Sequence, residues 1–364
     1  MPSPLEVVEQ ARVFKDTFEQ RWSLPWHGDT TTGSVWRHKL VYLLAELPSP
    51  LFDEVMVLLL EDPSFALRGI ALHLIRMRGA RQFLDATCLA LSDPSINVRA
   101  VAVAALGQFG GDRPLEALLE IKDGDHAEVR KAAVEAFKRM RDTRSIPLLS
   151  RWAGRVGEHE PLRKAACEAL GAIGDEAAIP LLQRVIVDDS VADDVRGEAA
   201  RSLGLIGGAE ALRHLEAGLS SARAWVRAHS AEGLGLMGAT SMVDRLKTMM
   251  DPPEPWMVRT FAIESVARLG GPDVFDSLMR HAKDPEIRIR GSVCVGLGFV
   301  GTPDAQRALK TFLADGDWGI RIQALEQLSR ASGRDFGFRV EDHKDTLNLK
   351  AVEAAVKAAS DYEP

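Results

Sequence analysis

The sequence contains only three cysteines, Cys88, Cys167 and Cys294, and none stands in a Cys-x-x-Cys or other metal-binding spacing. So few cysteines exclude a disulfide scaffold, and we expect buried free thiols in a reducing compartment. Residues 1–6 lack a basic stretch followed by an apolar core, so no signal peptide is expected. No apolar run approaches the roughly 20 residues that a membrane-spanning helix needs. The expected location is the cytoplasm, without membrane insertion.

A basic excess is also missing: 45 Lys and Arg stand against 52 Asp and Glu, a formal charge of −7. Binding to nucleic acid or to an anionic membrane needs a basic surface, so neither partner is expected. No Gly-rich phosphate loop, nucleophile elbow or dinucleotide fingerprint occurs. The nine histidines share no common position in the pattern described below, so they predict no metal cluster. We expect no cofactor and no catalytic residues.

What the sequence does contain is a repeat. Ten arginines recur at successive spacings of 31, 31, 31, 33, 33, 31, 32, 31 and 31 residues: Arg37, Arg68, Arg99, Arg130, Arg163, Arg196, Arg227, Arg259, Arg290 and Arg321. A fixed period of this length indicates stacked supersecondary units rather than one compact domain.

Each unit is predicted to be a helical hairpin. A short first helix, such as 114–121, is followed by a turn with Asp-Pro or Asp-Gly, where Asp is expected to cap the second helix and Pro to occupy its first position. The second helix is expected to run about sixteen residues and to stop at a glycine, at 110, 174, 207, 238, 270 and 301. Counted from the repeat arginine, positions −1, +3, +6, +7 and +10 form the buried stripe, with Ala common at +3.

The ends of the chain depart from this pattern. We predict a helical cap over 1–34, with an amphipathic helix at 4–21 and an irregular, packed segment at 22–34 that holds Trp22 and Trp26. The repeats occupy 35–333, with longer turns at 154–160 and 188–194. Residues 334–364 are expected to form a charged connector and a capping helix over about 346–360.

The units resemble HEAT repeats, in the Asp-Pro, Val-Arg, Ala-Ala, Leu-Gly and Gly pattern seen at residues 93–110. They look most like the short, Ala-rich repeats of phycobilin lyase subunits. The resemblance implies an all-α fold, a right-handed α-solenoid of about ten HEAT-like hairpins with helical caps. It also implies that Asp and Arg of neighbouring units form a ladder, pairing Asp93, Asp284 and Asp315 with Arg99, Arg290 and Arg321 or their neighbours.

Two surface features have a structural and a functional interpretation. The repeat arginines suggest a phosphate track, but their place beside the turn Asp favours a structural ladder, over Arg68, Arg99, Arg130, Arg163, Arg196, Arg227, Arg259, Arg290 and Arg321. Glutamates recur at position +5 (Glu135, Glu168, Glu232, Glu264 and Glu326). They form either an acidic stripe for a basic partner or a solvated face paired at i,i+4.

Glycine recurs at position +8, at Gly107, Gly171, Gly204, Gly235 and Gly298. A glycine inside a helix costs about 1 kcal/mol relative to alanine, so five of them need a reason. We expect this position to face away from the buried stripe. Crowding between helices is the favoured explanation, and a shallow groove for a ligand backbone is the alternative.

An apolar series stands at the start of the second helices in the C-terminal half: Trp225, Trp256, Ile287 and Trp318, each 31 residues from the last. Their helical angle places them away from the buried stripe, and tryptophan is enriched among residues that anchor protein interfaces. They are candidate partner-binding residues, together with Glu232 and Glu264. Packing of each ring across a neighbouring turn is the structural alternative.

These patterns favour a non-enzymatic scaffold or adaptor whose partner is another protein, bound through a basic or amphipathic segment on the second-helix face or the Trp edge. The alternative is a phycobilin-lyase-like or other chromophore or cofactor maturation factor, by resemblance alone. The deoxyhypusine hydroxylase family also uses HEAT-like repeats, but it holds iron with paired His-Glu motifs, and His-Glu occurs once here, at His159-Glu160. A DNA glycosylase of the helical-repeat type needs a basic face, which the +5 glutamates do not supply.

Overall fold

The computed structural model describes residues 2–22, 31–337 and 349–363, and all regular secondary structure in these ranges is helical. The chain divides into two compact units, Met1–Ala169 (unit 1) and Leu170–Pro364 (unit 2). No helix among the described residues is both long and apolar enough to cross a lipid bilayer.

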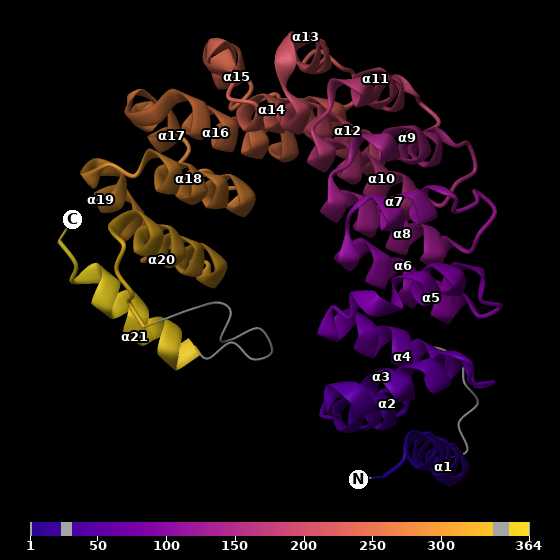
Figure 1. Ribbon diagram of the computed structural model, residues 1–364. Coiled ribbons are helices and arrows are strands. Elements are labelled where there is room, and N and C mark those ends of the chain that lie inside the picture. Colours follow the sequence, from indigo (N-terminus) through magenta and orange to yellow (C-terminus); the bar gives the residue numbers. More distant parts are fainter. Residues whose placement is uncertain (1, 23–30, 338–348, 364) are drawn as a thin grey trace. The chain divides into compact units, whose positions relative to one another are not determined.

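Nine helical hairpins follow one another from α3 to α20 (Figure 1). Their first helices are α3 (Ser49–Leu60), α5 (Leu84–Leu89), α7 (Asp112–Leu119), α9 (Ile146–Gly154), α11 (Ile179–Val187), α13 (Gly208–Gly218), α15 (Val243–Lys247), α17 (Phe275–Met279) and α19 (Pro303–Phe312). Their second helices are α4 (Phe65–Arg78), α6 (Ile96–Phe109), α8 (Ala127–Met140), α10 (Glu160–Ile173), α12 (Asp193–Ile206), α14 (Ala224–Leu236), α16 (Trp256–Gly270), α18 (Ile287–Val300) and α20 (Trp318–Ser332). Short 3-10 turns precede or follow several first helices.

Within each unit the second helices lie side by side in one row. In unit 1, α4 contacts α6 and α6 contacts α8; in unit 2 the same succession runs from α12 through α14, α16 and α18 to α20 (Figure 1). The row is held by position −1, whose side chains are all buried: Leu67, Val98, Val129, Leu162, Val195, Val226, Val258, Ile289 and Ile320. Position +3 is alanine with no exposed surface at Ala71, Ala102, Ala133, Ala166, Ala199, Ala262 and Ala324. This small side chain lets neighbouring helices approach closely.

Among the described residues, three further helices lie at the ends of the chain. The helix expected over 4–21 is α1 (Pro4–Trp22), and α2 begins at Thr31 and ends at Ala45. The prediction of an irregular segment is therefore wrong for Trp22 and for residues 31–34, while Trp26 lies outside the described residues. The expected last helix is α21 (Leu349–Ser360); its predicted first residues, 346–348, also lie outside them.

The turn aspartates do not cap the second helices, contrary to the prediction. Asp93 lies two residues before the cap Ser95 and accepts a hydrogen bond from the Ser95 backbone N–H at 2.8 Å. Asp62, Asp284 and Asp315 bond the residue two positions on in the same way. The following proline consequently stands before the cap rather than inside the helix. The turn is an Asx turn, which fixes the chain's path into the helix.

The second helices contain 13 to 15 residues, slightly fewer than predicted. Left-handed glycines stand at the expected ends 110, 174, 207, 238 and 301. The exception is α16, which continues through Gly270, so that Gly271 takes the positive φ of 55°.

Cysteine exposure differs from the prediction at one position. Cys167 and Cys294 are fully buried, but Cys88 in α5 is only partly so. Burial raises the pKa of the Cys294 thiol far above its usual range, and it also raises the pKa of the Cys88 thiol.

We expect a chromogenic disulfide reagent at pH 8 to modify Cys88 alone in the native chain, because the reagent cannot reach the two buried thiols. A stopped-flow trace on Cys88→Ser should then lack the native phase; a remaining native phase would contradict the assignment.

Candidate functional site

The repeat arginines connect successive hairpins. Arg290 donates from Nε to Asp315 Oδ2 at 2.8 Å and from Nη2 to Oδ1 at 3.0 Å, while Nη1 donates to the backbone oxygen of Asp284 at 2.9 Å. The equivalent pairs are Arg68–Asp93, Arg99–Asp125, Arg130–Glu158, Arg227–Glu254 and Arg259–Asp284. In these six pairs, the arginine of one hairpin contacts the acidic residue in the turn of the next hairpin. It does not pair with the side chain of the acidic residue in its own turn.

Three arginines of the predicted ladder make other bonds. Arg163 donates to Ala153 O, and Arg196 donates to Ile186 O and to Asp189 within its own hairpin. Arg321 donates to Asp315 O and lies over the ring of Trp318 at 4.4 Å. Each of these arginines thus donates at least one hydrogen bond to a protein acceptor, which favours a structural role over a phosphate track.

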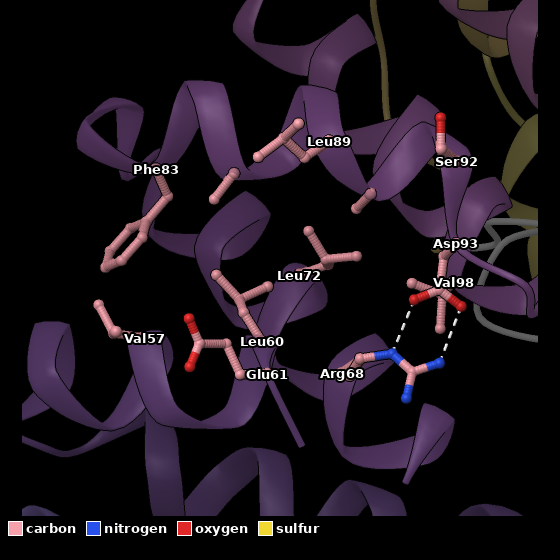
Figure 2. Close-up of a pocket in the computed structure, with 12 residues that line it drawn as sticks. Val57, Leu60, Glu61, Arg68, Leu72, Phe83, Leu89, Ser92, Asp93 and Val98 are labelled. Carbon is pink, nitrogen blue, oxygen red and sulfur yellow. Dashed lines mark hydrogen bonds and ion pairs between the residues drawn. The ribbon is translucent and has the colours of Figure 1, made fainter. Parts of the chain in front are cut away.

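A cavity of about 340 Å³ in unit 1 lies next to one of these pairs (Figure 2). Leu60, Leu72 and Phe83 supply apolar walls, and Arg68 and Asp93 close one side with two hydrogen bonds. The remaining Arg68 donors reach the backbone oxygens of residues 62 and 63. Since Arg68 and Asp93 bond each other and the other polar lining residues, Glu61 and Ser92, are exposed, we regard the cavity as a packing gap between hairpins.

The position +8 glycines pack against the next second helix. A Cβ built on Gly204 would lie 2.3 Å from Gly233 Cα, and one on Gly107 would lie 2.5 Å from Ala136 Cβ. The partner of each +8 glycine is residue +6 of the following repeat, also at Gly171–Ser202, Gly235–Ser265 and Gly298–Gln327. The expectation that +8 faces away from the core is therefore wrong, and crowding explains the glycines. Position +6 is correspondingly small or polar in unit 2 rather than apolar.

The second cavity, of about 550 Å³, is an open groove in unit 2, and it gathers several predicted residues. Trp225, Trp256, Ile287 and Glu264 line it; Trp256 and Ile287 keep 36% and 38% of their surface exposed. We call it the Trp groove. It crosses α14, α16, α18 and the start of α20, which are consecutive in the row of second helices (Figure 1).

Two rings that line the Trp groove, those of Trp225 and Phe261, are connected by the imidazole ring of His229. Trp225 stacks on His229 with 5.7 Å between ring centroids, and His229 lies 5.0 Å from Phe261 on the next second helix. The guanidinium of Arg288 lies 4.3 Å from the centroid of the Trp256 ring. Trp256 therefore already accepts a planar cation on its face, a favourable interaction between a cation and an indole ring.

Glu264 is one of two carboxylates that line the Trp groove; the other is Asp317. Ser292 Oγ donates to its Oε1 at 3.0 Å. Burial raises the pKa of Glu264, and the charge of Glu232 adds to that effect, while the Ser292 bond and Arg268 oppose it without cancelling it. The carboxylate is thus less stabilised by its surroundings than an ordinary surface glutamate.

Two predicted partner-binding residues are not among the residues lining the groove. Trp318 has the Arg321 guanidinium over its ring at 4.4 Å, as Trp256 has that of Arg288. Glu232 accepts from Arg201 at 3.2 Å and contacts His229 Nδ1 at 2.9 Å. The other +5 glutamates also form no common stripe: Glu168 pairs with Lys138 of the preceding repeat, and Glu135 and Glu326 are exposed.

Several lining residues were missed from the sequence. They include Thr260, Phe261, Gly291, Ser292 and Gln323, which occupy positions +1 and +2. At 100° per residue, these positions lie within 60° of +5 on the helix. The same angular argument that selected Glu264 could therefore have found them.

Comparison with known proteins agrees with the hairpin architecture. The model of the HEAT repeats family matches four overlapping segments, 53–138, 120–204, 192–260 and 253–329. The chain belongs to the HEAT-repeat family. The predicted all-α solenoid of HEAT-like hairpins is confirmed, while the match does not single out the phycobilin-lyase type.

Solved structures with HEAT-like architecture are similar at low identity. Importin beta shares 14% identity over 92% of this chain and 56% of its own, with a TM-score of 0.57. Human deoxyhypusine hydroxylase shares 20% over 74% of this chain and 98% of its own, with a TM-score of 0.30. Kap121p, in a complex with Pho4p, shares 11% over 96% and 47%, with a TM-score of 0.48. At 14% identity the likeness to importin beta shows the fold alone, and no curated protein matches the sequence.

No group of three or more His, Cys, Asp or Glu side chains placed to hold a metal ion occurs in residues 2–22, 31–337 and 349–363. His159, of the single His-Glu pair, stands in the turn before α10, where Glu158 accepts a hydrogen bond from its backbone N–H.

Proposed function

We propose that this HEAT-repeat protein is a non-enzymatic scaffold that binds another protein through the Trp groove of unit 2. The observation that carries the proposal is the exposure of Trp256 and Ile287 in a groove bordered by Trp225 and Phe261. Large apolar side chains in a concave surface lose much unfavourable hydration when a partner covers them, and tryptophan dominates the binding energy of many interfaces. A cytoplasmic location, as expected from the sequence, is part of this proposal.

The test uses substitutions that separate the groove from the rest of the Trp edge. In pull-downs from native cell lysate read by mass spectrometry, we expect Trp256→Ala/Ile287→Ala to reduce recovery of the partner at least tenfold. This corresponds to losing roughly 1.4 kcal/mol or more of binding free energy, which is modest for two interface anchors. Trp318→Ala is the matched control, since Trp318 occupies the same repeat position but does not line the groove.

Circular dichroism must first show that each variant is as helical as the wild type. Equal recovery of all proteins by wild type and Trp256→Ala/Ile287→Ala would contradict the proposal. A visible absorption band in the purified protein, with no protein partner, would instead favour the chromophore-maturation alternative.

A further inference from the structure

The groove holds a carboxylate that its surroundings satisfy only in part. An ionised carboxylate offers about four acceptor sites. Among the described residues, Ser292 makes the one side-chain hydrogen bond to Glu264. The nearest cation on the same helix, Arg268, has its guanidinium 4.6 Å from the centroid of the Phe299 ring. Glu264 therefore remains an anionic acceptor beside apolar walls.

Other carboxylates near the groove are already engaged. Asp317 caps α20 by accepting from the backbone N–H groups of residues 319 and 320, and Glu232 is paired with Arg201 and His229. An incoming cation consequently finds its best acceptor at Glu264. A new ion pair there would be partly desolvated, which strengthens its Coulomb energy relative to an exposed pair.

The positions of the apolar and anionic parts set the size of the ligand. Trp256 and Glu264 are eight residues apart on α16, a rise of about 12 Å along the helix. An extended peptide covers that distance in three to four residues. A single side chain is too short to reach both.

We propose that the Trp groove binds an extended peptide segment of a partner protein, with an apolar side chain against Trp256 and Ile287 and a lysine or arginine at Glu264. The two side chains stand three or four residues apart in the segment. This inference rests on the proposed function and adds the chemistry of the partner. Arg288, the one cation among the lining residues, lies at Trp256, while Arg268, whose charge acts on Glu264, is not part of the lining.

The experiment uses peptides selected from a random display library on the full-length chain. Fluorescein-labelled synthetic copies are then titrated by fluorescence anisotropy. We expect selected peptides to carry a basic residue three or four positions from an apolar one. Replacing an arginine by its uncharged isostere citrulline should weaken binding to the wild type at least tenfold, because a charge-assisted hydrogen bond is lost.

A double-mutant cycle assigns that loss to one residue. Glu264→Gln keeps the side-chain shape, so citrulline and arginine peptides should bind this variant within about twofold of each other. Glu326→Gln is the matched control, at the same repeat position on α20 but outside the groove lining, and should retain the full arginine preference.

The outcomes separate the two proposals. Peptides that need Trp256 but bind equally well with citrulline, or keep their arginine preference on Glu264→Gln, would overturn the cation assignment and leave the scaffold proposal standing. Failure to select any peptide whose binding depends on Trp256 would overturn both.

Discussion

Replacing Gly204 with alanine should lower the free energy of unfolding by about 2 kcal/mol. The new Cβ would lie 2.3 Å from Gly233 Cα and 2.4 Å from its backbone oxygen, so two helix backbones, α12 and α14, must move apart. Overpacking of this kind costs about 3 kcal/mol, and the better helix propensity of alanine returns about 1 kcal/mol. Valine at the same position should cost more. Urea unfolding followed by circular dichroism at 222 nm measures the difference.

The matched control for this prediction is Gly69→Ala in α4. Gly69 is also inside a second helix, but a Cβ there would meet nothing within 4 Å. This variant should gain about 0.5–1 kcal/mol from helix propensity. If Gly204→Ala were as stable as Gly69→Ala, close packing would not be the reason for glycine at position +8.

The contact between positions +8 and +6 could not be predicted from the periodicity of one helix. The glycines were visible as a recurring feature, but their face was assigned from the periodicity of a single helix. The contact is made with residue +6 of the next hairpin, so it depends on how two helices cross. Comparing the residue at +8 of each repeat with the residue at +6 of the next, as in Gly204 with Gly233 and Gly171 with Ser202, would have suggested this contact. Periodicity within one helix does not encode the register between neighbours.

The same limit applies to the arginine ladder. The resemblance to HEAT repeats implied ion pairing between Arg and Asp of neighbouring units. The sequence did not determine the direction of pairing, because Arg290 is six residues from Asp284 and twenty-five from Asp315. In the fold, Arg290 bonds the backbone oxygen of Asp284 and the carboxylate of Asp315. The distance between stacked hairpins determines which carboxylate the guanidinium reaches.

The Trp groove was predictable in its anchors and less so in its extent. The 31-residue spacing identified Trp225, Trp256 and Ile287, and all three line the groove. It also identified Trp318, which lies on the last hairpin of the described residues and does not line the groove. Local sequence gives the direction of a side chain from its helix; it does not give the neighbour that covers it.

Arg290→Ala should destabilise the chain by about 2–3 kcal/mol at pH 7. The substitution leaves Asp315 without its bidentate partner at a site where its side chain is only 12% exposed, and it also frees the backbone oxygen of Asp284. Removing one partner of a buried polar pair costs the desolvation of the group left behind. The exposed pair Arg307–Asp304 is the control, because Arg307→Ala should change stability by less than about 0.5 kcal/mol.

Asp315→Asn should cost less, about 1–2 kcal/mol, since the amide oxygen can still accept from the backbone N–H of Asp317 and from Arg290. A double-mutant cycle of the two substitutions isolates their interaction. Additive costs would contradict a direct contribution of the pair to stability.

The stability gap between wild type and Asp315→Asn should also depend on pH. Hydrogen bonds from Arg290 lower the pKa of Asp315, and burial opposes them without prevailing. A carboxyl group whose pKa is lower in the folded state stabilises the fold above its unfolded pKa, near 3.9, and loses that effect as pH falls through the folded value. The gap should therefore be constant from about pH 5 to 7 and shrink below pH 4. A gap that stayed constant in urea titrations down to pH 2.5 would mean that the carboxylate charge contributes nothing, and that the ladder acts through hydrogen-bond geometry alone.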